Sequence, residues 1–179
     1  QVVVDGETHS YVKDQEGHTV GYFDGKLRNE IPGAVIAPIV GGLGEAAPLV
    51  YDVPLTSTLT TVLSGEGIIH NDTTSVAQFG PDFAVTLDAI PVSAMTNDKI
   101  TVATDGSAVK YESNEEKSVS IDMALNHTVP ALGAAAVGGA PDFRFTVSDL
   151  PVSNSVSVLV EADGELVVYN ANGGEGTYS

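Results

Sequence analysis

The chain has 179 residues, a hydrophobic fraction of 42% and a formal net charge of -17, from 7 basic and 24 acidic side chains. This composition supports a packed core and argues against disorder. The negative charge disfavours binding to nucleic acid or to anionic membranes. The absence of cysteine excludes disulfides, thiolate zinc sites and thiol catalysis.

Residues 1–56 are expected to hold an N-terminal hairpin and an apolar extended segment. Asp24-Gly25 follows the β-prone run 18–22 and has the composition of a type I′ hairpin turn. Residues 32–44 carry no charge and are too short, and too interrupted by Pro38, to span a membrane. Two interpretations stay open: an ordinary buried strand with its linker, or a segment that contacts a neighbouring subunit. The uncharged stretch 129–140 resembles it in composition.

Residues 57–111 and 112–179 are each expected to form a β repeat unit of about five strands. Apolar and polar residues alternate over 83–88, 118–124 and 143–148, which is typical of half-buried antiparallel strands. No capped amphipathic helix of three turns is visible. The pattern predicts an all-β fold with little or no helix, an antiparallel β-sandwich or Greek-key arrangement of the Ig-like or jelly-roll-like kind.

The two units share an internal repeat of about 60 residues. More than half of the positions in 81–93 are identical to those in 141–153, and each block ends in Pro-Val-Ser, which is expected to close a strand at a corner. The pattern V-x-x-D-G-x-x-x-x-Y occurs at 102–111 and 160–169, and once more at 2–11. Asp-Gly between β-prone runs predicts a hairpin turn. The units are two small domains or two halves of one sandwich, and the full strand pattern in each favours two packed units.

Calcium is the one metal that the acidic side chains suggest, because Ca²⁺ prefers oxygen ligands. The candidates are Asp82 and Asp142, which recur in the repeated Pro-Asp-Phe, and the loop aspartates Asp98 and Asp149. No D-x-[DN]-x-[DN]-G loop is present, and the plainer interpretation is a solvated acidic face. The aspartates of the Asp-Gly pairs are assigned to turn chemistry instead.

Other motifs point to no catalytic site. Residues 42–47 fit G-x-G-x-x-A, but Pro38 and Pro48 remove the flanking strand and helix that a dinucleotide site needs. The histidines lie in no HExxH motif, and no GxSxG or phosphate-binding loop occurs. His70 and His127 would be the first residues to substitute if hydrolysis were found. Asn71 and Asn126 begin glycosylation sequons, which permit a surface location without requiring one.

These features predict a non-catalytic structural protein, a subunit of an extracellular, pilus-like filament or a capsid or tail decoration protein of a virion. The acidic, cysteine-free, Asp-Gly-rich pattern is broadly similar to such proteins but carries no diagnostic family motif. Assembly is expected through β-sheet edges and apolar loops, with copies of itself or another structural subunit as partners, at a cell surface or on a virion. The alternative is a β-sandwich module that binds a carbohydrate or a protein, and an enzyme comes third.

Overall fold

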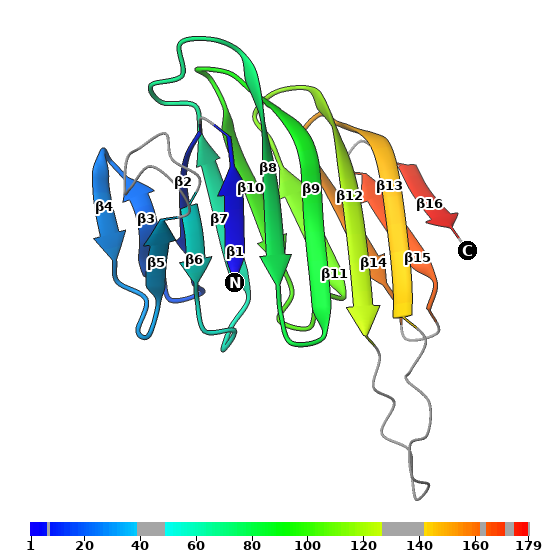
Figure 1. Ribbon diagram of the computed structural model, residues 1–179. Coiled ribbons are helices and arrows are strands. Elements are labelled where there is room, and N and C mark those ends of the chain that lie inside the picture. The colour runs from blue at the N-terminus through cyan, green and yellow to red at the C-terminus, as the bar shows by residue number, and fades with distance from the viewer. Residues whose placement is uncertain (7, 39–48, 127–141, 162–163, 171–173, 179) are drawn as a thin grey trace, which may run out of the picture.

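The structure, a computed structural model, describes residues 1–6, 8–38, 49–126, 142–161, 164–170 and 174–178, which form two antiparallel β-sheets and no helix (Figure 1). The seven-stranded sheet has the spatial order β13 (Asp142–Val152), β12 (Lys117–Asn126), β9 (Phe83–Val92), β8 (Asp72–Phe79), β1 (Val2–Asp5), β6 (Leu49–Asp52) and β5 (Val35–Pro38). The nine-stranded sheet has the order β16 (Gly174–Tyr178), β15 (Leu166–Asn170), β14 (Ser155–Val160), β11 (Ala108–Glu112), β10 (Asn97–Val102), β7 (Leu59–Ser64), β2 (His9–Lys13), β3 (Thr19–Phe23) and β4 (Lys26–Asn29). Within the described ranges, then, no helix could cross a bilayer.

The core lies between the two sheets, and the alternation in the sequence explains which side chains fill it. Val85 and Leu87 of β9, Ile121 and Met123 of β12 and Ile100 of β10 point inward and are buried, while the residues between them face solvent. A period of two on an antiparallel strand places every second side chain on one face. The predicted antiparallel β-sandwich is therefore confirmed.

Both sheets draw strands from all three predicted segments of the chain. Residues 1–56 supply β1, β5 and β6 to one sheet and β2, β3 and β4 to the other. From β8 onward the chain alternates between hairpins: β8–β9 and β12–β13 in the seven-stranded sheet, β10–β11 and β14–β15 in the nine-stranded sheet. The division into units at 56/57 and 111/112, and the duplication itself, stay predictions.

The matching sequence blocks occupy matching strands and share local geometry. Ala89 in β9 and Asp149 in β13 both have φ of 53°, where each hairpin shifts its register. The amide of Ala89 donates to Ser75 Oγ, and that of Asp149 to Ser120 Oγ, at 3.4 Å in each case. The extra residue at a β-bulge explains the unusual φ.

A second shared feature is an aromatic ring packed on a turn glycine of the opposite sheet. A Cβ atom added to Gly106 would overlap the ring of Phe83, and one added to Gly164 would lie 3.3 Å from the ring of Phe143. At Gly106 only glycine leaves room for the ring, whereas at Gly164 the contact is tight without excluding a Cβ atom.

The three Asp-Gly pairs of which the structure describes both residues form three different connections. Asp24 and Gly25 have φ of 51° and 64° between the paired strands β3 and β4, which confirms the predicted type I′ turn. Gly106 alone is at positive φ in the β10–β11 turn, in which its amide donates to Ala103 O at 3.0 Å. Asp5-Gly6 differs again, because β1 and β2 lie in different sheets and the pair makes a crossing, not a hairpin.

The strands end within the repeated Pro-Val-Ser blocks, as the sequence predicts, but each proline itself still belongs to its strand. β9 continues through Pro91 to Val92, and β13 continues through Pro151 to Val152. β12 pairs with β9 only as far as Ser120 and Asp88, so Pro91 has a paired strand on one side only. A missing N–H is tolerated where no described strand needs it.

The apolar segment 32–44 is described as far as Pro38. Its residues 35–38 form β5, an edge strand paired with β6, in which Val35 is 56% exposed. Ala34, just before β5, is buried in the core. The interpretation of residues 39–44 and 129–140 as interface loops concerns residues outside the described ranges.

Candidate functional site

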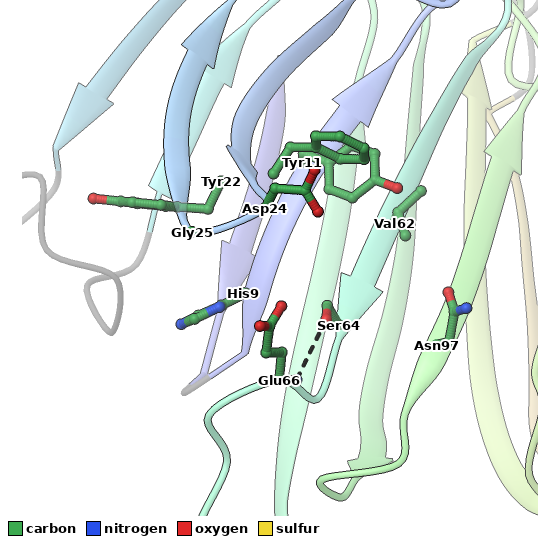
Figure 2. A pocket seen from close by; sticks show the side chains of 10 residues that line it. His9, Tyr11, Tyr22, Asp24, Gly25, Val62, Ser64, Glu66 and Asn97 are labelled. Carbon is green, nitrogen blue, oxygen red and sulfur yellow. Dashed lines mark hydrogen bonds between the residues drawn. The ribbon is translucent and has the colours of Figure 1, made fainter.

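A concavity of about 220 Å³ lies on the outer face of the nine-stranded sheet. It forms where β2, β3, β7 and β10 run side by side, and Figure 2 shows the side chains that surround it. Its lining consists of aromatic and polar groups: His9, Tyr11, Tyr22, Phe23, Asp24, Gly25, Val62, Ser64, Glu66 and Asn97. Neighbouring strands supply His9, Ser64 and Asn97 in one cross-strand row, which is why residues distant in sequence meet here.

The aromatic rings of this concavity pack mainly on one another. Tyr11 and Phe23 meet edge to face with ring centroids 5.0 Å apart, and the guanidinium carbon of Arg28 lies 4.4 Å from the Phe23 ring centroid. His9 and Tyr22 lie tilted with centroids 6.1 Å apart. Because Arg28 covers one face of Phe23, less flat aromatic surface is open to a ligand than the composition suggests.

The polar groups give the concavity a negative character. Asp24 and Glu66 are exposed carboxylates, and Figure 2 places Asp24 beside Tyr11 and Glu66 near His9. Burial raises the pKa of the Tyr11 phenol, and the nearby Asp24 charge raises that pKa further. The phenol therefore stays protonated and able to donate a hydrogen bond. This arrangement of a phenol donor and carboxylate acceptors can bind polar groups.

A second cluster lies in the β2–β3 turn. His18 Nδ1 lies 2.9 Å from Asp14 Oδ2 and 3.6 Å from Glu16 Oε2, and the three are the one set within the described ranges with metal-ligand spacing. The Asp14 carboxylate raises the pKa of His18 through its hydrogen bond and its charge. Burial raises the pKa of Asp14, but the hydrogen bonds from His18 outweigh this and lower it. A turn closed by its own hydrogen bonds accounts for the cluster.

The four aspartates predicted as calcium ligands are not brought together. Asp98 lies in β10 of the nine-stranded sheet and is fully buried, whereas Asp149 is exposed in the bulge of β13. Asp82 and Asp142 lie at the same end of β9 and β13, on either side of β12, and Asp82 O accepts the Asn126 amide at 2.7 Å. The Asp142 side chain lies outside the described residues, so calcium binding there stays a prediction.

The histidines named for catalysis have no described catalytic surroundings. His70 is exposed in the loop between β7 and β8, and His127 lies outside the described ranges. Asn71 and Asn126, the sequon residues, are both exposed.

A buried polar cluster, which the sequence analysis missed, joins the two sheets at the upper end of Figure 1. Asp98 of β10 accepts hydrogen bonds from Tyr111 and Ser113 and forms an ion pair with Lys117, the first residue of β12. Burial of the ring raises the pKa of Tyr111, and the Asp98 charge raises it further, so Tyr111 remains a donor. Its signal in the sequence was an acidic residue at an inward position of an alternating strand, 97–102.

The outer edge of β13 is a third candidate, for contact with another chain. β13 ends the seven-stranded sheet, and no described strand pairs with its outer side. Phe143, Phe145 and Val147 point toward the core but stay partly exposed there. An edge strand presents unpaired N–H and C=O groups to which another strand can add.

Comparison of the chain with family models, with curated proteins and with solved structures gave no match.

Proposed function

We propose that the protein is a non-catalytic structural subunit that assembles through the edge of its seven-stranded sheet. Its setting would be an extracellular, pilus-like filament or the surface of a virion, and its partners would be copies of itself or another structural subunit. The observation that carries this proposal is the difference between β9 and β13, two strands of similar sequence.

β9 shows what a strand of this sequence requires to bury its side chains. It lies between β8 and β12, and its inward residues Phe83, Val85 and Leu87 are at most 5% exposed. Among the described strands, only β12 pairs with β13, and the inward residues Phe143 and Phe145 of β13 are partly exposed. A further strand on β13, placed as β12 is placed on β9, would cover them.

The free edge of β13 is protected at one end and open at the other. The bulge at Asp149 and the proline at 151 interrupt regular pairing near its C-terminal end. From Asp142 to Val147 the strand pairs regularly with β12 and has neither feature. β-Strand addition needs such a regular edge, because main-chain hydrogen bonds supply most of its affinity.

The net charge sets the conditions under which this assembly forms. A formal charge of -17 on each copy opposes association at low ionic strength. Salt shortens the distance over which these charges repel, to roughly 8 Å at physiological ionic strength. Assembly is therefore expected to strengthen as salt is added.

The test is the native mass by light scattering at low and high salt, followed by proline substitution in β13. Backbone N–H groups of consecutive strand residues point to opposite sides, so one of Thr146→Pro and Val147→Pro removes a free-edge donor and the other removes a bond to β12. We expect one variant to keep its circular dichroism spectrum and thermal transition and to lose assembly. Thr86→Pro, at the matching position of β9, is the control and should unfold.

Two results would contradict the proposal. One is a stable 18.4 kDa monomer under every condition, with and without candidate partner subunits. The other is normal assembly by both folded β13 variants.

The second candidate is a binding module, and the concavity beside Tyr11 favours it. Tyrosine, histidine and carboxylate side chains around a shallow hollow suit a sugar or a polar peptide. Titration with glycan and peptide arrays tests this candidate. Tyr11→Ala should abolish binding, whereas Tyr169→Ala, which removes an exposed tyrosine elsewhere on the same sheet, should leave binding unchanged.

A further inference from the structure

The buried ion pair between Asp98 and Lys117 is arranged for a covalent reaction as well as for charge pairing. Asp98 is 0% exposed and the Lys117 side chain 4%, and Lys117 Nζ lies 2.9 Å from Asp98 Oδ2. Two opposite charges removed from water are costly to keep, even when they are paired. An amide formed from the two groups would carry no charge. We infer that Lys117 and Asp98 condense to an isopeptide bond that joins the two sheets.

The chemistry balances without any further reactant. One proton of the Lys117 ammonium first passes to the Glu115 carboxylate, which frees the lone pair of Nζ. Nζ then attacks Asp98 Cγ, the new N–C bond forms, and the Cγ–Oδ2 bond breaks. The leaving oxygen takes the proton held by Glu115 and a second proton from the amine nitrogen, and it departs as one water molecule. No oxidation or reduction occurs, and the product is a secondary amide between β10 and β12.

The groups around Asp98 suit this step. Ser113 Oγ donates to Oδ1 at 2.7 Å and polarises the oxygen that remains as the amide carbonyl. Tyr111 Oη donates to Oδ2 at 2.6 Å, on the oxygen that leaves. Tyr111 is itself 0% exposed, so the site excludes the water that would otherwise favour the separated ions.

Glu115 is placed to move the protons. Its Oε2 atom lies 3.6 Å from Lys117 Nζ, and the carboxylate accepts hydrogen bonds from Ser93 and Thr96 at 2.9 to 3.1 Å. Burial raises the pKa of Glu115, but these hydrogen bonds and the Lys117 charge outweigh burial and keep the pKa below its usual value. A carboxylate held this close to the amine can accept a proton and return it to the leaving oxygen.

The carbonyl group of Pro91 helps to hold the Lys117 amine in place. Nζ also donates to Pro91 O at 2.9 Å, at the part of β9 that β12 does not pair with. The amine is therefore fixed by contacts to β9 and β10 while its own backbone begins β12. Fixing two reactants at this separation removes most of the entropic barrier to their reaction.

The chain contains a matched pair that should not react. Lys110 Nζ also lies 2.9 Å from a carboxylate, that of Glu112, but both side chains are on the surface, 48% and 39% exposed. Water stabilises these ions and competes for any intermediate. Burial, and not distance, is what distinguishes Lys117 from Lys110.

The test is the intact mass of the purified full-length protein, followed by tryptic mapping. We expect the mass to be one water molecule below the sequence mass. Trypsin does not cleave after an acylated lysine, so residues 29–99 should stay joined to residues 111–144. Lys117→Arg and Asp98→Ala should restore the full mass, Lys110→Arg should not, and Glu115→Gln should slow the loss of water at least tenfold.

The map separates this bond from the other route that loses water. A succinimide at an Asp-Gly pair also removes one water molecule, but it leaves Lys117 cleavable and persists in Lys117→Arg. The inference is overturned if the folded wild-type chain keeps the full sequence mass on incubation, or if the tryptic map shows 111–117 as a free peptide. Neither outcome depends on whether the protein assembles.

Discussion

The strands β8–β11 and β12–β15 have matching sequence blocks and the same bulge, yet their side chains have different surroundings. Tyr111 of β11 is fully buried, whereas Tyr169 of β15, at the matching position, is 43% exposed. Val102 pairs with Val109 in the first hairpin, but Val160 pairs with Leu166 in the second, so the second turn is one residue shorter. A slip of one residue turns every side chain of the returning strand to the other face.

The comparison of β8–β11 with β12–β15 also explains why the second set of strands has no counterpart of the Asp98–Lys117 ion pair among its described residues. The position that matches Asp98 is Val156, which is buried and apolar. At Pro151 the carbonyl oxygen accepts a hydrogen bond from the neutral Asn170 amide at 2.9 Å, whereas at Pro91 it accepts one from the Lys117 ammonium. Related strands therefore carry a charged connection between sheets in one half and a neutral one in the other.

The largest expected difference in the free energy of unfolding is between alanine substitutions of the two matching tyrosines. Tyr111→Ala removes a fully buried ring and should lower the free energy of unfolding by about 3–5 kcal/mol. Tyr169→Ala, on the outer face, should lower it by about 0.5 kcal/mol. Denaturant titration of both variants checks this, and equal losses would mean that the two hairpins share one register.

Substitution of the two turn glycines should likewise cost more stability in the β10–β11 turn than in the β14–β15 turn. Gly106→Ala places a methyl group on the Phe83 ring at φ of 74°, and should cost about 2–5 kcal/mol from overpacking and backbone strain together. Gly164→Ala meets the Phe143 ring at 3.3 Å, so backbone strain of about 1–2 kcal/mol should dominate. Thermal unfolding of the two variants gives the comparison. A smaller loss of thermal stability for Gly106→Ala than for Gly164→Ala would contradict the tighter packing of the Phe83 ring on Gly106.

Acid should lower the stability that Glu115 contributes beside the buried polar cluster of Asp98 and Lys117. Although burial raises the pKa of Glu115, hydrogen bonds from Thr96 and Ser93 hold it below its usual value in the folded chain, so the carboxylate stabilises the fold above the unfolded-state pKa. This contribution should disappear as pH falls through the folded pKa. Urea unfolding at pH 7 and at pH 3 should show a smaller difference for Glu115→Gln than for the wild type. An unchanged pH dependence in that variant would exclude Glu115 as a contributor.

The smallest expected effect concerns the bulges that the two halves share. Ala89→Gly should stabilise the fold by about 1 kcal/mol, because alanine is strained at φ of 53° and glycine is not. Asp149→Gly should change stability less, because aspartate tolerates this conformation better than alanine does. Differential scanning calorimetry can resolve the two shifts. A larger gain at Asp149 would show that its bulge is the more strained of the two.

Much of the fold could be predicted from the sequence because it depends on local patterns. Alternation over 83–88 and 118–124 identified strands, and Asp24-Gly25 identified a type I′ turn, since each rests on neighbouring residues alone. The strand ends within residues 90–93 and 150–153 were also predicted, but the inclusion of Pro91 and Pro151 in the strands was not. Whether a proline is tolerated depends on whether a neighbouring strand needs its N–H, and that neighbour is distant in sequence.

The candidate sites were less predictable for the same reason. The alternation over 97–102 places Asp98 at an inward position, but no local pattern reveals its partner Lys117, which belongs to another sheet. The concavity likewise combines β2, β3, β7 and β10, whose order in the sheet does not follow the sequence.

The sequence by itself determined the fold class, the inward and outward positions over 83–88, 118–124 and 143–148, and the strongly negative charge, because side-chain periodicity and charge are properties of the chain. Only the tertiary structure decided that β9 is interior while β13 is an edge, that Tyr111 is buried while Tyr169 is not, and that Asp98 meets Lys117. The physical reason is that burial depends on which strands pair beside a residue, and pairing between distant strands is fixed by the whole sheet.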